Sequence, residues 1–260
     1  MNGENTPDDF LVDLKRYIGF YDDLSMSIIG FVRLGAQNII NFDSYVYSSM
    51  KGTLESIKDI VAAGRIGDAY ALLRRFHDSA TINIYSSLYL EDNFTLENRV
   101  VEKINDWLQG KAQIPEFRIM SDYIRRSARV SMLNELIYSD HRYKEIRDRC
   151  NSFTHYNFFE HVLLNDSRVF VRDRADWSNR LRLDLRDLFI FHIAYLFLIN
   201  DHYMMSSDYV DCLECGMAPE EGAEYWVAPF IQDVFTEILV SARPDLAIIV
   251  RNNSQMKLRL

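Results

Sequence analysis

The sequence predicts an all-α fold, a multi-helix bundle built around one long, buried central helix. Only 10 glycines and 5 prolines interrupt 260 residues, whereas sheet proteins need frequent turn formers. Between these breakers, apolar residues recur at helical spacing. A chain of this length buries a large core without disulfides or metal, and no composition break divides it, so we expect one domain over residues 1–260 with about eight to ten helices.

Five helical segments are expected in the first half of the chain. Asp8 and Asp9 can cap the first segment, Thr53 opens the third and Thr95 the fifth, which Gly110 stops. Apolar spacing sets the extent of the other two. The expected ranges are 10–21, 24–50, 53–64, 69–90 and 95–110.

Beyond the connection at Pro115, a helical stripe of apolar residues predicts a helix over about 119–136, in the basic middle part of the chain. Another helix begins at Asp140, and its period fails at Asn151 and Ser152, with Thr154 available to cap the next segment. Residues 169–172 are the one candidate for a strand.

The central helix should cover about residues 181–205, because its middle is apolar on almost every side. Its densest apolar run, 188–199, is shorter than the roughly 20 residues that span a bilayer, so we expect no membrane segment. A later helix over about 227–242 ends before Pro244, and the tail has room for one more. The residues of the central helix expected in the core are Leu188, Ile190, Phe191, Ala194, Tyr195 and Leu198.

Charge and cysteine content narrow the function classes. The formal net charge of −9 argues against nonspecific binding of nucleic acid by the whole molecule, although residues 111–186 hold 15 Lys and Arg against 11 Asp and Glu. The first 20 residues contain no apolar signal segment, and three cysteines fit a reducing compartment. We therefore predict a cytoplasmic protein without disulfides.

Common cofactor and hydrolase motifs are missing from the sequence. Gly30-x4-Gly35 lacks the lysine of a phosphate-binding loop, and no G-x-G-x-x-G, H-E-x-x-H or G-x-S-x-G occurs. Cys212 and Cys215 form a lone C-x2-C that could complete a zinc site only with Cys150 and His202. We expect neither a cofactor nor a bound metal.

The most informative run is 147–156, where a helical pattern breaks into turn formers and Arg149 precedes His155 by six positions. A guanidinium can hold two phosphate oxygens, and an imidazole can carry a proton near neutral pH. Six residues of unbroken helix place two side chains about 120° apart and about 9 Å along the axis. The pair can therefore meet only across a helix break or with a second chain. The structural alternatives are an ion pair of Arg149 with Glu145 and a polar contact of His155 at a helix start.

A second pair at similar spacing, Arg186 and His192, lies in the expected central helix, where His192 fits a hydrogen-bonded core residue. In another apolar helix, Arg74 and Asp78 are four residues apart, which favours a structural ion pair.

Arg149-x5-His155 resembles the Arg-x4-6-His signature of HEPN domains, helical bundles of prokaryotic toxins and phage-defence proteins, over about residues 121–202. The run 71–76 is similar in texture to the second helix of bacterial proteins related to these domains. One departure is Cys150, where the family often has a polar residue directly after its arginine.

The resemblance implies RNA as a partner, a homodimer and, for the toxin type, an antitoxin. In catalytic members it implies cleavage of RNA without metal, with His155 as proton carrier, Arg149 on the phosphate, and Asn151 and Tyr156 orienting them. The alternative is a noncatalytic helical interaction protein in which the same residues make structural contacts. Catalysis requires Arg149 and His155 to converge in an exposed groove, whereas the structural alternative buries or separates them.

Overall fold

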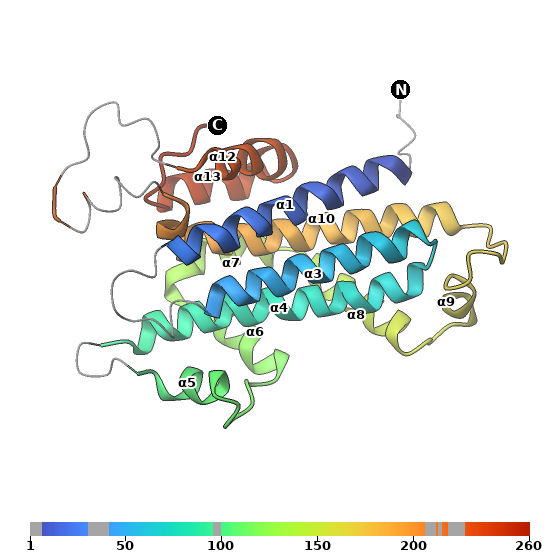
Figure 1. Ribbon diagram of the computed structural model, residues 1–260, viewed down its shortest axis with the longest axis horizontal. Coiled ribbons are helices and arrows are strands. Elements are labelled where there is room, and N and C mark those ends of the chain that lie inside the picture. Colours follow the sequence, from blue (N-terminus) through green and yellow to red (C-terminus); the bar gives the residue numbers. More distant parts are fainter. Residues whose placement is uncertain (1–6, 31–41, 96–99, 206–211, 213–214, 218–226) are drawn as a thin grey trace.

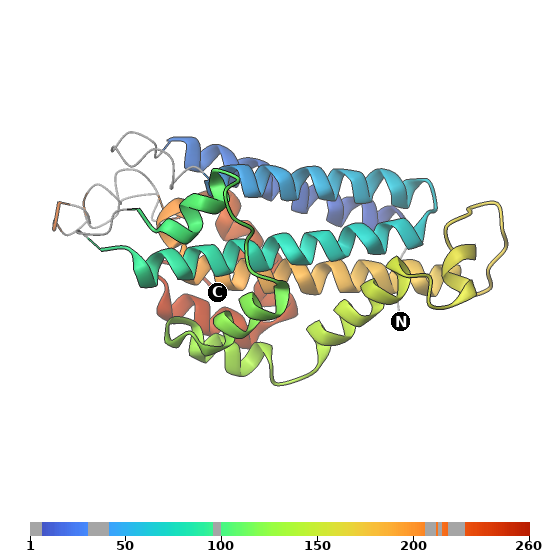
Figure 2. The same cartoon turned by 90° about the horizontal axis from the view of Figure 1, so that it is seen from below.

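The computed structural model describes residues 7–30, 42–95, 100–205, 212, 215–217 and 227–260. All regular elements in these ranges are helical, which confirms the predicted all-α bundle. The four longest helices run along the length of the molecule, with shorter helices around them (Figures 1 and 2). The long helices are α1 (Pro7–Gly30), α3 (Phe42–Ala62), α4 (Ile66–Asn93) and α10 (Arg174–Ile199); the short ones are α5 (Glu102–Leu108), α6 (Phe117–Arg126), α7 (Ser131–Ile137), α8 (Arg142–Thr154), α9 (Phe159–Leu163), α12 (Pro229–Val234) and α13 (Pro244–Asn253).

Helices that follow one another in the first part of the sequence also pack against one another. Helix α1 packs against α3, α3 against α4, and α4 against both α8 and α10. The tight turn from α3 to α4 depends on Gly64, whose φ of 74° is a left-handed conformation. A Cβ at this position would also lie 3.0 Å from the Cβ of Ser167, so the turn and the loop before α10 can approach only with glycine here.

Helix α10 occupies the centre of the core, as predicted. All six of its expected core residues are at most 3% exposed. Phe189, which is fully buried, stacks on Tyr17 with ring centroids 4.2 Å apart and meets Phe20 and Tyr21 edge-on. These contacts join the middle of α10 to α1, about 170 residues earlier in the sequence.

Three expected boundaries in the first half are wrong, one of them at Thr95, because α5 begins only at Glu102. Helix α1 continues through Asp22 and Asp23 to Gly30, because Asp22 faces α3 and forms a salt bridge with Lys51 instead of ending the helix. Thr53 lies inside α3, where its hydroxyl donates to the carbonyl of Ser49 one turn earlier, so it caps nothing.

The helix expected over 119–136 is also wrong, because the chain breaks at Ser127 into α6, a 3₁₀ turn (Ala128–Val130) and α7. The side-chain amide of Asn134 donates to the carbonyls of Ile124 and Arg125 and so satisfies the end of α6. A pattern of apolar residues cannot reveal such a break, since both pieces keep their apolar face towards the core.

Residues 169–172 form an irregular connection and not the expected strand. The guanidinium of Arg174 explains this, because it donates hydrogen bonds to the backbone carbonyls of this loop and of the α3–α4 turn. A side chain therefore satisfies oxygens that a neighbouring strand would otherwise satisfy. The carbonyls belong to Gly64, Leu163, Leu164, Asp166 and Val169.

At the carboxyl-terminal end, α10 stops at Ile199 and a 3₁₀ turn (Asp201–Met204) follows. The helix expected over 227–242 is present as α12, continued by a π-helical segment (Phe235–Val240), and the additional helix in the tail is α13. None of the described helices combines the length and hydropathy needed to cross a bilayer.

Candidate functional site

Helix α8 directs Arg149 towards α10, where it forms a two-pronged ion pair with Asp184. Its Nε lies 2.9 Å from Oδ2 and its Nη2 lies 2.7 Å from Oδ1. The Tyr70 hydroxyl of α4 also donates to Oδ2, at 3.0 Å. Because Asp184 is only 3% exposed, its charge depends on these donors. Arg149 therefore forms a structural ion pair, but its partner is Asp184 and not Glu145, the residue that helical spacing suggested.

Arg149 and Asp184 line an open groove of about 390 Å³ between α8 and α10. Four arginines and four acidic residues line it, so its charges are balanced. Arg142 lies 3.4 Å from the carboxylate of Asp140 and 3.6 Å from that of Asp187. A polyanion needs a surplus of positive charge, which this groove does not present. The remaining lining residues are His141, Glu145, Arg180, Leu183 and Arg186.

His155 lies outside that groove, exposed at the end of α8. The expected break at Asn151 and Ser152 is absent, because α8 continues to Thr154 and the His155 amide still donates to the carbonyl of Asn151. An unbroken helix separates the directions of Arg149 and His155. The structure therefore brings Arg149 to Asp184 and carries His155 to the surface beyond the helix.

The other two candidate residues flank this turn. Asn151 is half-buried, and its amide oxygen lacks a hydrogen-bond partner among the described residues. Tyr156 has a φ of 48°, a left-handed conformation that turns the chain sharply after α8. Its hydroxyl lies 3.5 Å from the Nδ2 of Asn165. Tyr156 is thus a neighbour of His155 at the surface, while Asn151 remains on the helix.

Large aromatic side chains gather on the exposed segment that follows α8, residues 155–172, which we call the aromatic tip. Figure 1 shows α9 and its flanking loops at one end of the bundle, next to the α3–α4 turn. Phe158, Phe159 and Phe170 are 64%, 74% and 90% exposed, and Tyr156 is 49% exposed. Sequence reasoning missed this feature, although Phe158 and Phe159 stand side by side after a turn.

A rigid base supports the aromatic tip. Phe153 at the end of α8 stacks between Tyr70 and the imidazole of His161. The Trp177 indole of α10 donates to a carboxylate oxygen of Glu160, at 3.1 Å. These contacts fix α9 on the bundle, so the exposed rings are carried by an ordered support.

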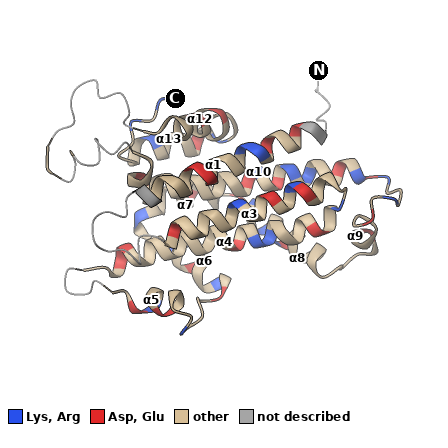
Figure 3. Cartoon of the chain, viewed as in Figure 1, with Lys and Arg blue, Asp and Glu red and all other residues tan. Residues whose placement is uncertain are grey.

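The same tip carries two acidic residues, Glu160 and Asp166, which balance its two arginines, Arg168 and Arg172. Both arginines are exposed, and the side chain of Arg168 is 89% exposed although it pairs with Asp166. Figure 3 shows basic positions in the loop beside α9 at this end of the molecule. The tip thus presents rings and guanidinium groups together to solvent.

A buried polar chain crosses the core away from the tip. The Tyr21 hydroxyl lies 2.6 Å from His192 Nδ1, and His192 Nε2 lies 2.9 Å from Asn83 Oδ1. Since an amide oxygen only accepts, Nε2 carries the proton and Nδ1 accepts from Tyr21. The amide nitrogen of Asn83 in turn donates to Asp43. His192 is therefore a hydrogen-bonded core residue, as predicted, and burial lowers its pKa to about 3.

Replacing Asp43 by asparagine is expected to remove one contribution to the pH dependence of stability, a loss of stability between about pH 4 and pH 7. Burial raises the Asp43 pKa to about 7, so the folded chain retains a proton that the unfolded chain releases near pH 4. Stability from Asp43 is complete in acid and is lost as the pH rises to 7, a change of up to about 4 kcal/mol. Urea denaturation at several pH values would measure it.

The parent and Asp43→Asn both contain His77 and His192, so the difference between their pH profiles of stability reports on Asp43. Equal pH profiles for the parent and Asp43→Asn would contradict a raised pKa at this carboxyl.

The cysteines and the Arg74–Asp78 pair are the remaining residues that the sequence singled out. In the part of the chain that the structure describes, no group of three or more His, Cys, Asp or Glu side chains could hold a metal ion. Cys150 is buried in α8, Cys212 is half-buried and Cys215 is exposed. The salt bridge predicted between Arg74 and Asp78 is replaced by one between Asp78 and Arg147 of α8, at 2.6 Å.

Comparisons of the chain with family models, curated proteins and solved structures found no match.

Proposed function

We propose that this chain is a HEPN-like RNA-binding protein whose aromatic tip receives single-stranded RNA. The observation that carries the proposal is the exposure of Phe158, Phe159 and Phe170 on the same segment as Arg168. Unpaired bases stack on exposed rings, and each stacked base contributes about 1 to 3 kcal/mol whatever its identity. Guanidinium groups on the same segment bind the phosphates that join those bases.

Binding is better supported than cleavage by a single chain. Arg149 is held by Asp184, whereas His155 stands at the tip, close in sequence to the exposed rings. For metal-independent cleavage with His155 as the proton carrier, an arginine of a second copy would have to supply the phosphate contact. The Arg149–Asp184 pair also favours the alternative, a noncatalytic helical interaction protein, because Arg149 neutralises a buried carboxylate in this pair.

Changing Phe158 and Phe159 together to alanine is expected to weaken the binding of a single-stranded RNA by at least tenfold, since two stacking surfaces are lost. Fluorescence anisotropy with a labelled oligonucleotide at low salt would measure this change. Tyr45→Ala is the matched control, because Tyr45 is 75% exposed on α3, outside the tip. Arg168→Gln should lower the dependence of affinity on salt by about one ion.

Cleavage is tested on the same RNA. If the parent cuts it without metal, His155→Ala should lower the rate by about 10²- to 10⁴-fold and leave binding intact. Light scattering would show whether a homodimer accompanies activity or whether the mass stays near 30.6 kDa. A parent protein that does not bind RNA at low salt would exclude the RNA proposal and favour the interaction protein.

A further inference from the structure

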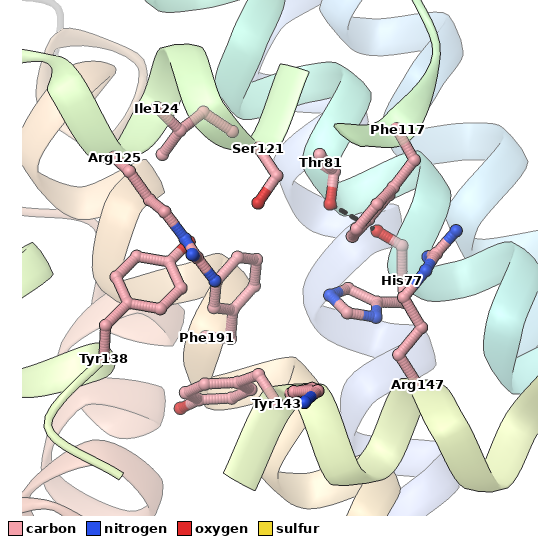
Figure 4. A pocket seen from close by; sticks show the side chains of 11 residues that line it. His77, Thr81, Phe117, Ser121, Ile124, Arg125, Tyr138, Tyr143, Arg147 and Phe191 are labelled. Atoms are coloured by element: carbon pink, nitrogen blue, oxygen red, sulfur yellow. Dashed lines mark hydrogen bonds between the residues drawn. The ribbon is translucent and has the colours of Figure 1, made fainter. Parts of the chain in front are cut away.

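A separate cavity of about 110 Å³ lies on the other side of α8, between α4, α6, α8 and α10 (Figure 4). Its walls are mainly aromatic. The His77 ring lies 5.3 Å from Phe117 and 5.6 Å from Phe191, and Tyr143 lies 5.0 Å from Phe191. Flat, apolar walls of this kind accommodate a planar ring.

Two buried polar atoms in these walls have no hydrogen-bond partner among the described residues. They are Nδ1 of His77 and the hydroxyl of Tyr143, on side chains of residues that are 4% and 5% exposed. Burial, with a smaller contribution from the charge of Arg147, lowers the His77 pKa to about 3, so this imidazole is neutral at pH 7. Both atoms are shielded from solvent, so they lie behind the surface of the cavity and leave its wall mainly apolar.

The outer part of the cavity is positively charged. Arg125 and Lys144 are exposed, and Arg147 is half-buried. The Arg147 guanidinium lies 3.3 Å from the centroid of Phe117, and that of Arg125 lies 4.2 Å from the centroid of Tyr138. Among the described lining residues there is no aspartate or glutamate, and Asp78 neutralises only Arg147. This rim thus favours an anion over a neutral molecule.

We propose that the cavity binds a small single-ring aromatic carboxylate. The ring lies between Phe117 and Phe191, and the carboxylate faces Arg125 and Lys144 at the rim. A polar substituent on the ring meets the Ser121 hydroxyl, which points into the cavity (Figure 4). The size is suitable, because an enclosed apolar cavity of about 150 Å³ holds benzene and this one opens to solvent. This site is independent of the proposed RNA-binding function.

Isothermal titration calorimetry of the full chain with 4-hydroxybenzoate tests the proposal. We expect saturable binding of one molecule per chain, with much weaker binding of 4-hydroxybenzamide, which lacks the charge, and of acetate, which lacks the ring. The double variant Arg125→Gln/Lys144→Gln should lower the affinity by about tenfold, because two rim charges are removed. The matched control is Arg126→Gln/Lys111→Gln, which removes the same charge from exposed residues outside the cavity.

Three outcomes would overturn the proposal. They are no binding of 4-hydroxybenzoate at millimolar concentration, equal binding of acetate, and equal losses in the two double variants. Ser121→Leu provides a second measurement that does not depend on charge, because the larger side chain fills the cavity from α6. It should abolish binding while circular dichroism remains that of the parent, and unchanged binding would place the ligand elsewhere.

Discussion

Replacing Arg149 by methionine is expected to lower the free energy of unfolding by about 3 to 5 kcal/mol. The loss arises at Asp184, whose buried carboxylate would keep, among the described residues, only the Tyr70 hydroxyl as a donor. Asp184→Leu should cost less, because the Arg149 side chain is 25% exposed and can turn towards water. In the double variant both charges are gone, so we expect it to recover much of the stability.

Urea denaturation of the parent, the two single variants and the double variant gives the coupling energy. Arg168→Gln is the control, because it breaks an ion pair at a side chain that is 89% exposed and should change stability by less than about 1 kcal/mol. A loss below about 1 kcal/mol for Arg149→Met would show that the carboxylate does not depend on the guanidinium. The same variant then becomes a clean test of Arg149 in RNA binding.

Phe189→Ala is expected to cost about 3 to 5 kcal/mol, because it removes a fully buried ring and leaves a cavity at the contact of α10 with α1. Chemical denaturation monitored by circular dichroism would measure the change. Phe159→Ala is the matched control, since this ring is 74% exposed and its loss should alter stability by about 0.5 kcal/mol at most. Similar losses in the two variants would contradict the burial of Phe189.

The sequence was sufficient for the fold class and for the central helix, because hydrophobic spacing directly reports which residues face a core. It was insufficient at boundaries that side chains create. The break at Ser127 depends on Asn134, and the loop before α10 depends on Arg174, and neither contact follows a spacing rule. In contrast, the boundary expected between the segments 10–21 and 24–50 falls inside a helix that is continuous to Gly30.

The candidate site shows the same division. Arg149 and His155 were identified as a pair by their spacing, but the actual partner of Arg149 lies 35 residues away on another helix. The sequence contained one usable signal, because Asp184 is an acidic residue close to the most apolar run of the chain, where a buried charge requires a cation. The exposed rings of the aromatic tip could not be separated from core residues by composition alone.

The position of α10 also determines how the chain must fold during synthesis. Residues 188–199 are buried against α1 and α4, helices that leave the ribosome more than 80 residues earlier. Until α10 appears, the apolar faces of α1, α3 and α4, with Tyr21, Tyr47 and Phe76, lack the helix that covers them. The emerging chain therefore exposes an incomplete, aggregation-prone bundle for seconds at ordinary rates of translation, a period in which chaperones can bind it.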